Sequence, residues 1–203
     1  MAAGDTDVKI CSDALVLLGS ARITSFTDGT TAASLCSDLY PAVRDSALMM
    51  HRWRFAQKKV QLQQVSTAPV NEWRYAYQLP ADRLGHPVAA YRSANTGDSL
   101  FYAWELQADQ LLTNDTTVVI DYLYRVSEDL MPAHFVQLLK YLMAMQLAEP
   151  VTDQMSKAVW WKDMAVGPAS ENQRGGWFRQ AMAIDSSGAP PYAITDYPLV
   201  DVR

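Results

Sequence analysis

Apolar residues recur at helical spacing in the first fifty positions. The first stripe consists of Val8, Cys11, Leu15 and Leu18. Thr6 precedes it as a helix N-cap, and Gly19 follows it as a helix stop. A second stripe consists of Leu35, Leu39, Val43 and Ala47. We expect its helix to begin at Thr30 or Thr31 and to be kinked or split at Pro41, which has no amide hydrogen.

After Phe55 the pattern changes to an alternation of polar and apolar residues, which is typical of β-strands. The segments that read as strands are residues 58–65, 73–77, 88–91, 100–106, 111–112 and 117–126. Turn-forming residues separate them, for example at residues 95–98 (NTGD). The middle of the chain is therefore predicted to form antiparallel strands.

Helical spacing returns after Ser127, which we expect to cap a helix with Pro132 near its start. Apolar residues cover this helix almost all round: Phe135, Leu138, Leu139, Leu142, Met143, Met145 and Leu147. Such a helix is buried centrally or between subunits. Pro150 should end it.

A fourth helix should begin at Thr152 or Asp153. Its apolar positions are Met155, Val159, Trp160 and Met164. The Gly-Pro pair at residues 167–168 should break or bend it, and helix should resume after the Gly-Gly pair at residues 175–176.

The last segment, residues 186–203, has no helical period but is too apolar for a solvated tail. Its apolar residues are Tyr192, Ile194, Tyr197, Leu199, Val200 and Val202, and Arg203 ends it. An extended apolar segment usually lies on another surface. The sequence leaves open whether that surface belongs to the chain's own domain or to a neighbouring molecule.

These elements predict an α+β fold. Residues 1–56 and 127–185 should form an antiparallel helical bundle, with two helices from each part. Residues 57–126 should form an inserted antiparallel β domain, and residues 186–203 an extended C-terminal arm.

Composition narrows the function classes. The chain has 203 residues, 49% of them apolar, and a formal net charge of −5. This balance argues against a protein that wraps nucleic acid, because such proteins carry a basic face. Cys11 and Cys36 lie in predicted helices, where we expect buried free thiols rather than a disulfide. No secretory signal or membrane-length apolar run opens the chain, so we expect a soluble protein made in a cytoplasm.

No motif for catalysis, phosphate binding or metal binding occurs in the sequence. The histidines, His51, His86 and His134, are widely spaced and lack a second ligand at zinc-site spacing. His134 is expected to be a surface or partly buried residue. The carboxylates Asp13, Asp38 and Asp45 are expected on solvated helix faces. We therefore expect no cofactor, no metal and no enzymatic activity, although a Cys-His pair assembled in space could still make a small hydrolase.

The most specific local cluster, residues 51–59 (HRWRFAQKK), is basic and aromatic and lies where helix gives way to strand. It has two interpretations. Trp53 and Phe55 could anchor a partner, and its acidic groups or phosphates would then meet Arg52, Arg54, Lys58 and Lys59. Alternatively, the aromatic rings close the end of the helical core, which we favour for the rings, and the basic residues face water.

Five segments, taken in order, resemble the phage tail tubular protein A family. They are residues 13–19 (DALVLLG) with 23–26 (ITSF), 53–56 (WRFA), 73–82 (WRYAYQLPAD), 122–126 (YLYRV) and 131–135 (MPAHF) with 148–152 (AEPVT). The third matches the family pattern W.YAY.LP.D and is the most specific. The resemblance covers roughly residues 8 to 165. The Gly-Pro pair at 167–168 and the Gly-Gly pair at 175–176 depart from the family's continuous last helix.

The resemblance implies a structural protein of the virion, a head-to-tail adaptor of short-tailed bacteriophages. Such adaptors form a ring, expected to hold twelve copies, between the portal protein and the tail nozzle protein. DNA passes through the channel without being read, and no membrane is involved. In such adaptors, helical ends and C-terminal arms contact the portal. The candidate residues for an interface with the portal or with a neighbouring subunit are Tyr192, Ile194, Tyr197, Leu199, Val200, Val202 and Arg203 of the arm, together with Arg52 and Arg54. The alternatives are a stopper or another ring protein of a long-tailed phage neck, and a small hydrolase.

Overall fold

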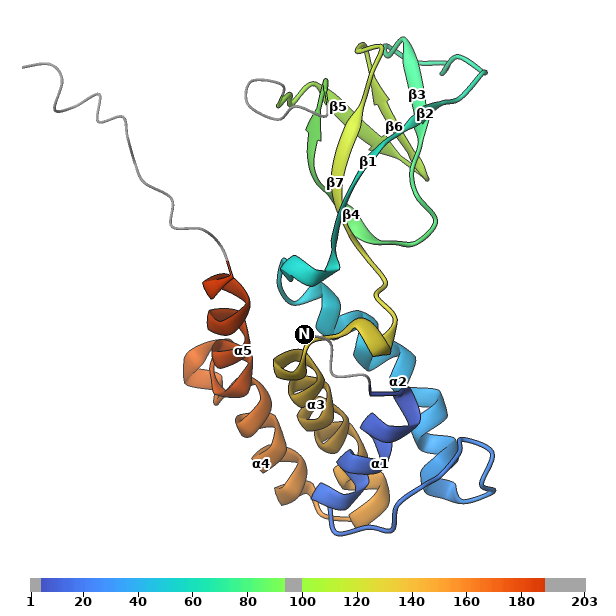
Figure 1. Cartoon of the computed structure of the whole chain (residues 1–203). Coiled ribbons are helices and arrows are strands. Elements are labelled where there is room, and N and C mark those ends of the chain that lie inside the picture. Colours follow the sequence, from blue (N-terminus) through green and yellow to red (C-terminus); the bar gives the residue numbers. More distant parts are fainter. Residues whose placement is uncertain (1–4, 94–99, 189–203) are drawn as a thin grey trace, which may run out of the picture.

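The computed structural model describes residues 5–93 and 100–188 of the chain. Helices gather at one end of the molecule and strands at the other (Figure 1). The helices are α1 (Asp7–Leu17), α2 (Thr31–Met49), α3 (Ala133–Thr152), α4 (Met155–Val166) and α5 (Gly176–Ser187). Single 3-10 turns lie at η1 (Arg54–Ala56), η2 (Glu128–Leu130) and η3 (Ala169–Glu171). The predicted fold class, α+β with a helical bundle and an antiparallel β insertion, is confirmed.

The two N-terminal helices begin where threonine side chains cap them. The Thr6 hydroxyl oxygen accepts a hydrogen bond from the Lys9 amide, and the Thr30 hydroxyl from the Ala33 amide, each at 3.2 Å. The predicted starts are therefore confirmed. The predicted split at Pro41 is wrong, because α2 is one continuous helix. Pro41 is exposed, so water can bind the carbonyl that lacks its amide partner.

Helix α3 differs from its prediction at both ends. Ser127 precedes the short turn η2 instead of capping α3, which starts directly after Pro132. Pro150 does not end the helix. Its missing amide leaves the carbonyl of Gln146 without a donor, but Gln146 and Pro150 are exposed, so water can take that place. The helix ends at Asp153, which adopts a left-handed conformation with φ 53°. Asp153 therefore caps the end of α3 and does not begin the next helix.

In the described part of the chain, three helices follow the strands instead of the expected two. The break predicted at the Gly-Pro pair separates α4 from α5, since α4 ends at Val166 and Gly167 has φ 80°. In Figure 1, α4 and α5 follow one another along the same side of α3. Helix α5 runs to Ser187, so the first two residues expected in the arm are helical.

The strands form two antiparallel sheets. One has the order β1-β7-β4, formed by Gln57–Gln61, Val119–Tyr124 and Arg83–Tyr91. The other has the order β2-β3-β6-β5, formed by Gln63–Gln64, Tyr75–Gln78, Gln110–Thr113 and Trp104–Gln107. The strand expected over residues 58–65 is therefore two strands in different sheets, and buried Leu62 lies between them. The turn expected at residues 95–98 lies outside the described residues.

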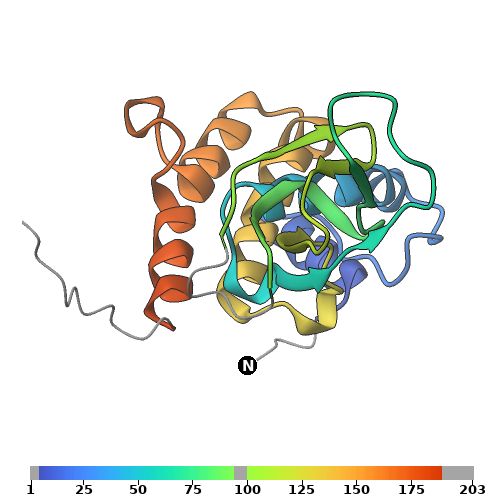
Figure 2. The ribbon, with the colours of Figure 1, turned by 90° about the horizontal axis from the view of Figure 1, so that it is seen from above.

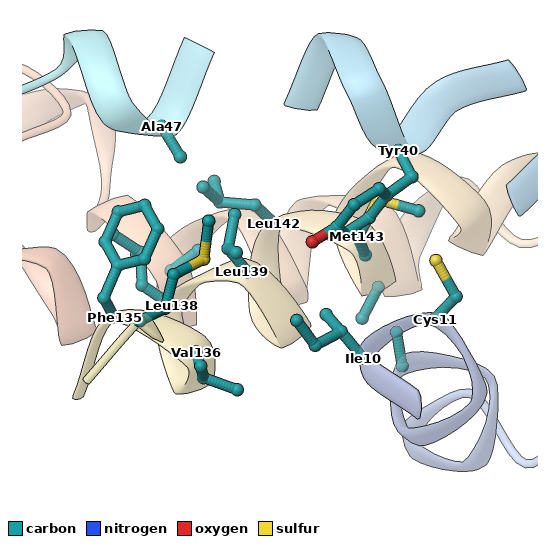
Figure 3. Packing of buried hydrophobic residues seen from close by; sticks show 14 of the residues in the cluster. Ile10, Cys11, Tyr40, Ala47, Phe135, Val136, Leu138, Leu139, Leu142 and Met143 are labelled. Carbon is teal, nitrogen blue, oxygen red and sulfur yellow. The ribbon is translucent and has the colours of Figure 1, made fainter. Parts of the chain in front are cut away.

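Buried apolar residues form two separate clusters. The larger fills the helical end, where α3 is central: its side chains meet Ile10 and Cys11 of α1 and Tyr40 of α2 (Figure 3). The expected central burial of α3 is thus confirmed. The smaller cluster lies among the strands and includes Tyr77, Leu111 and Ile120. The domain bounds at residues 56–57 and 126–127 remain a prediction.

Ion pairs join α2 to the chain that leaves the last strand. Asp45 of α2 accepts hydrogen bonds from Arg44 at 3.0 Å and from Arg125 at 2.6 Å. Arg44 also pairs with Glu128 at 2.9 Å. Burial raises the pKa of Asp45, but the bonds from Arg125 and Arg44 outweigh it, so the pKa lies below its ordinary value. The expectation that Asp45 simply faces water is wrong.

Candidate assembly surfaces

Helix α4 exposes a row of large apolar side chains. The exposed fractions are 62% for Met155, 51% for Val159, 53% for Trp160 and 40% for Met164. We call these four residues the α4 outer face. Large apolar side chains with such high exposure are stabilised when another surface covers them, and contiguous exposed apolar patches often mark binding sites. Trp is also the residue type most enriched among the energetically dominant residues of protein interfaces.

The opposite side of α4 packs against the bundle. Trp161 is buried and stacks on Tyr141 of α3, with ring centroids 5.4 Å apart. Ala165 and Val166 are buried in the same cluster. The adjacent residues Trp160 and Trp161 therefore point to different environments. The apolar positions that predicted this helix are the ones that prove to be exposed. Trp161 and Ala165, which are four residues apart and equally apolar, form the buried side.

At the junction of helix and strand, the aromatic residues belong to the core. Trp53 is fully buried, and its indole nitrogen donates to the Ala47 carbonyl at 2.9 Å. Its ring lies 5.1 Å from that of Phe135 and 6.0 Å from that of Phe178. Phe55 is half-buried against the same cluster. The interpretation that these rings close the helical core is confirmed.

The basic residues of the junction divide into two groups. Lys58 pairs with Asp82 at 2.9 Å and Lys59 with Asp121 at 3.3 Å, so their charges are met within the chain. Arg52 and Arg54 are exposed, and neither guanidinium forms an ion pair with residues 5–93 or 100–188. Their role as interface residues stays a prediction.

A groove of about 490 Å³ lies beside Arg52, between the end of α2 and strand β4. Its lining comprises Met49, Met50, His51, Arg52, Leu84, Gly85, His86, Pro87, Val88 and Leu123. Met49 and Met50 are exposed at its edge. The groove brings His51 and His86 into one lining with Arg52, although the two histidines are far apart in the sequence.

Beneath Arg54 lies a buried polar contact that the sequence did not reveal. Asp185 of α5 is buried, and its carboxylate accepts a hydrogen bond from the Arg54 amide at 3.0 Å. The second carboxylate oxygen lies 4.0 Å from Nε2 of His134, which has no hydrogen-bond partner within residues 5–93 and 100–188. Burial lowers the pKa of His134, although the charge of Asp185 works in the other direction. His134 is partly buried, as expected.

The other candidate chemical groups are dispersed. Cys11 and Cys36 are buried free thiols, as predicted. Hydrogen bonding with Cys36 and burial raise the pKa of the Cys11 thiol, which makes it a poor nucleophile. Among the described residues, no three histidine, cysteine, aspartate or glutamate side chains gather in a way that could hold a metal ion. No described helix combines the length and apolar character needed to cross a membrane.

Asp13 also departs from its prediction. Its carboxylate lies 2.8 Å from the Lys140 ammonium group of α3 and 3.2 Å from that of Lys9. Asp13 thus joins α1 to α3 instead of facing water, whereas Asp38 is exposed as predicted. The tail residues Tyr192, Ile194, Tyr197, Leu199, Val200, Val202 and Arg203 lie outside the described residues.

No protein family matches the chain, and no curated protein matches it. Two solved structures are weakly similar: the neck of an empty GTA particle with C6 symmetry and the neck of a native GTA particle with C12 symmetry. Both are 16% identical, and each match covers 79% of this chain and 94% of the other. The TM-scores are 0.26 and 0.24. Similarity this weak carries no argument about function.

Proposed function

We propose that this chain is a structural protein of a tailed bacteriophage, an adaptor at the head-to-tail junction of the virion. In this proposal, identical copies form a ring between the portal protein and the tail nozzle protein. The ring surrounds a channel through which DNA passes, and twelve copies are expected. The chain would act by contact alone, with no cofactor and no reaction.

The observation that carries the proposal is the α4 outer face. Met155, Val159 and Trp160 are each more than half exposed, along one side of a single helix. Burying apolar surface is worth about 25 cal/mol per Å², so covering such a face on each of many copies would favour assembly strongly. Repeated contacts of modest strength also reinforce one another in a closed ring.

The resemblance to the tail tubular protein A family supports the adaptor role in particular. Its most specific motif, residues 73–82, covers strand β3 and runs up to the start of β4. The aromatic-x-Phe-Ala motif at residues 53–56 coincides with η1 and the rings that close the helical core. The motifs thus fall on elements that this fold uses, in the order in which the family has them.

The charge of the chain fits passage of DNA rather than binding. Acidic residues outnumber basic ones, 22 to 17. Several basic side chains also pair with carboxylates of the same chain, as Lys58 and Lys140 do. A ring with few free cations would neutralise few phosphates and so hold DNA weakly.

The test is reconstitution with the portal protein of the same phage. The chain and the portal are mixed, and the complex is imaged by negative-stain electron microscopy along its axis. We expect a ring of this chain on one end of the portal, with about twelve copies by symmetry. A chain that never binds the portal at micromolar concentration would overturn the adaptor role. Attachment to a preformed neck ring instead would favour the stopper alternative.

A further inference from the structure

The α4 outer face is short and covers about half of the helix circumference, with Met155 and Met164 at its two edges. From Met155 to Met164 the helix rises about 14 Å. In the part of the chain that the structure describes, no other segment covers these side chains, which remain 40% exposed or more. Two half-buried charged residues lie beside this face, Lys162 and Asp163, three and four residues after Val159. A suitable partner would therefore be an apolar segment a few residues long that also carries a few charged side chains.

Residues 192–203 of this chain have that composition. The segment YAITDYPLVDVR contains six large apolar residues and two carboxylates, Asp196 and Asp201. It begins a few residues after α5 ends at Ser187. Residues 189–203 can span at most about 50 Å, which is ample to cross one helix and reach a neighbouring molecule.

The segment fits the α4 outer face of another copy better than that of its own. Because α5 continues the path of α4 away from the loop between them, the tail leaves at the far end of α5 (Figure 1). To reach its own α4 it would first have to return along α5, over about 18 Å. The residues used for this return would cross the exposed surface of α5, where Arg179, Gln180, Ser186 and Ser187 are polar and Ile184 is apolar, and they could not contact α4 as well. On a second copy, the whole apolar run can face α4.

We infer that residues 192–203 of one copy bind the α4 outer face of the adjacent copy. This inference rests on the proposed function and names the partner of each surface within the ring. Every copy gives its tail to one neighbour and accepts the tail of the other. Such a head-to-tail contact uses two different surfaces of each subunit, and it closes when the rotation per copy divides a full turn.

The experiment locates the tail by photo-crosslinking in the full-length chain. A benzoylphenylalanine replaces Met155, which is exposed on the outer face. Chains labelled with ¹⁴N and ¹⁵N are mixed in equal amounts, assembled on the portal and irradiated. We expect peptides from residues 192–203 to be cross-linked to α4, with the two labels mixed as random pairing requires. Cross-links only between identical labels would show that the tail binds its own chain, and would overturn the inference.

Variants sharpen the test. Trp160→Glu and Leu199→Glu should each lower the yield of the cross-link about tenfold or more, because each places a charge in the apolar contact. Val70→Glu is the matched control, since Val70 is also an exposed apolar residue but lies in the β region. It should leave the yield unchanged. Equal yields in all three variants would overturn the inference.

Failure of the inference can be told from failure of the proposed function. A ring that forms on the portal without a cross-link between α4 and the tail would refute the inference alone. Absence of any ring, seen in the same samples by negative stain, would refute the adaptor role and the inference with it.

Discussion

At the scale of single residues, the chain places its buried charges and polar groups where segments meet. Asp185 holds the Arg54 amide, and Asp13 lies between Lys9 and Lys140. Buried polar groups are costly unless they are paired, so each contact restricts how its segments can pack. The contact of Asp185 with Arg54 could not be predicted from the sequence, because the two residues lie 131 positions apart. The pair of Lys9 and Asp13, four residues apart on one helix, is of the kind that helical spacing predicts.

Burial of His134, whose Nε2 has no hydrogen-bond partner among the described residues, should make the free energy of unfolding depend on pH. Burial lowers its pKa below the ordinary 6.5, so folding favours the neutral ring. The contribution of the neutral His134 ring to the free energy of unfolding should be fully present above pH 6.5. It should be lost as the pH falls through the lowered pKa. In urea denaturation, the free energy of unfolding should therefore fall more between pH 7.5 and 5.5 for the wild type than for His134→Gln. His86→Gln, at an exposed position, is the control and should behave as the wild type.

Lys140 should contribute more to stability than Lys9, although both contact Asp13. Both ammonium groups also lie near Asp5, at 2.8 Å for Lys9 and 3.7 Å for Lys140, but the Lys140 side chain is only 15% exposed, whereas that of Lys9 is 55% exposed. Lys140→Met would leave two half-buried carboxylates without their shielded cation, at a cost of about 1–3 kcal/mol. Lys9→Met should cost less than about 1 kcal/mol. Chemical denaturation measures both, and equal losses would contradict this assignment.

At the scale of elements, the sequence predicted what local chemistry decides. The threonine caps located the starts of α1 and α2, and the Gly-Pro pair located the end of α4. Proline misled the prediction twice, at Pro41 and Pro150. Both are exposed, so the helix loses a hydrogen bond without burying the freed carbonyl. The path of the chain from one sheet to the other at Leu62 could not be predicted, since both strands share one alternating pattern.

For the candidate surfaces too, the sequence predicted the elements but not which of their side chains are buried. The junction motif correctly indicated a helix end closed by Trp53. The apolar residues of α4 correctly indicated a helix but not which side is buried. Hydrophobic spacing alone cannot distinguish a face that packs within the chain from one that waits for a partner. Only the packing of Trp161 on α3 resolves that question.

Arg52 and Arg54 lie on the segment that joins α2 to strand β1. If they meet acidic groups of a partner, the double variant Arg52→Ala, Arg54→Ala should bind the portal about tenfold more weakly at low salt. The difference should shrink at high salt, because screening weakens exposed charge pairs. Biolayer interferometry at 50 mM and 500 mM NaCl would measure it. A defect independent of salt would exclude an electrostatic role.

At the scale of the whole molecule, stability and assembly should be separable. The bundle core is complete among the described residues, with α3 buried among its neighbouring helices (Figure 2). If the tail binds another copy, it contributes nothing to the free energy of unfolding of the isolated monomer. Deleting residues 192–203 should then change the melting temperature by less than about 2 °C, which corresponds to under 1 kcal/mol for a chain of this size. Differential scanning fluorimetry measures this on the monomer.

The same deletion should abolish the ring on the portal, as seen by negative stain. A full-length variant in which residues 192–203 are shuffled is the matched control for length and composition. It should also fail to assemble if the contact depends on the order of apolar and acidic residues along the tail. A fall in melting temperature of several degrees on deletion would mean instead that the tail packs on its own chain. In that case the free energy of tail binding would stabilise the folded monomer and could not also hold two copies together. The α4 outer face would then need a different partner for assembly.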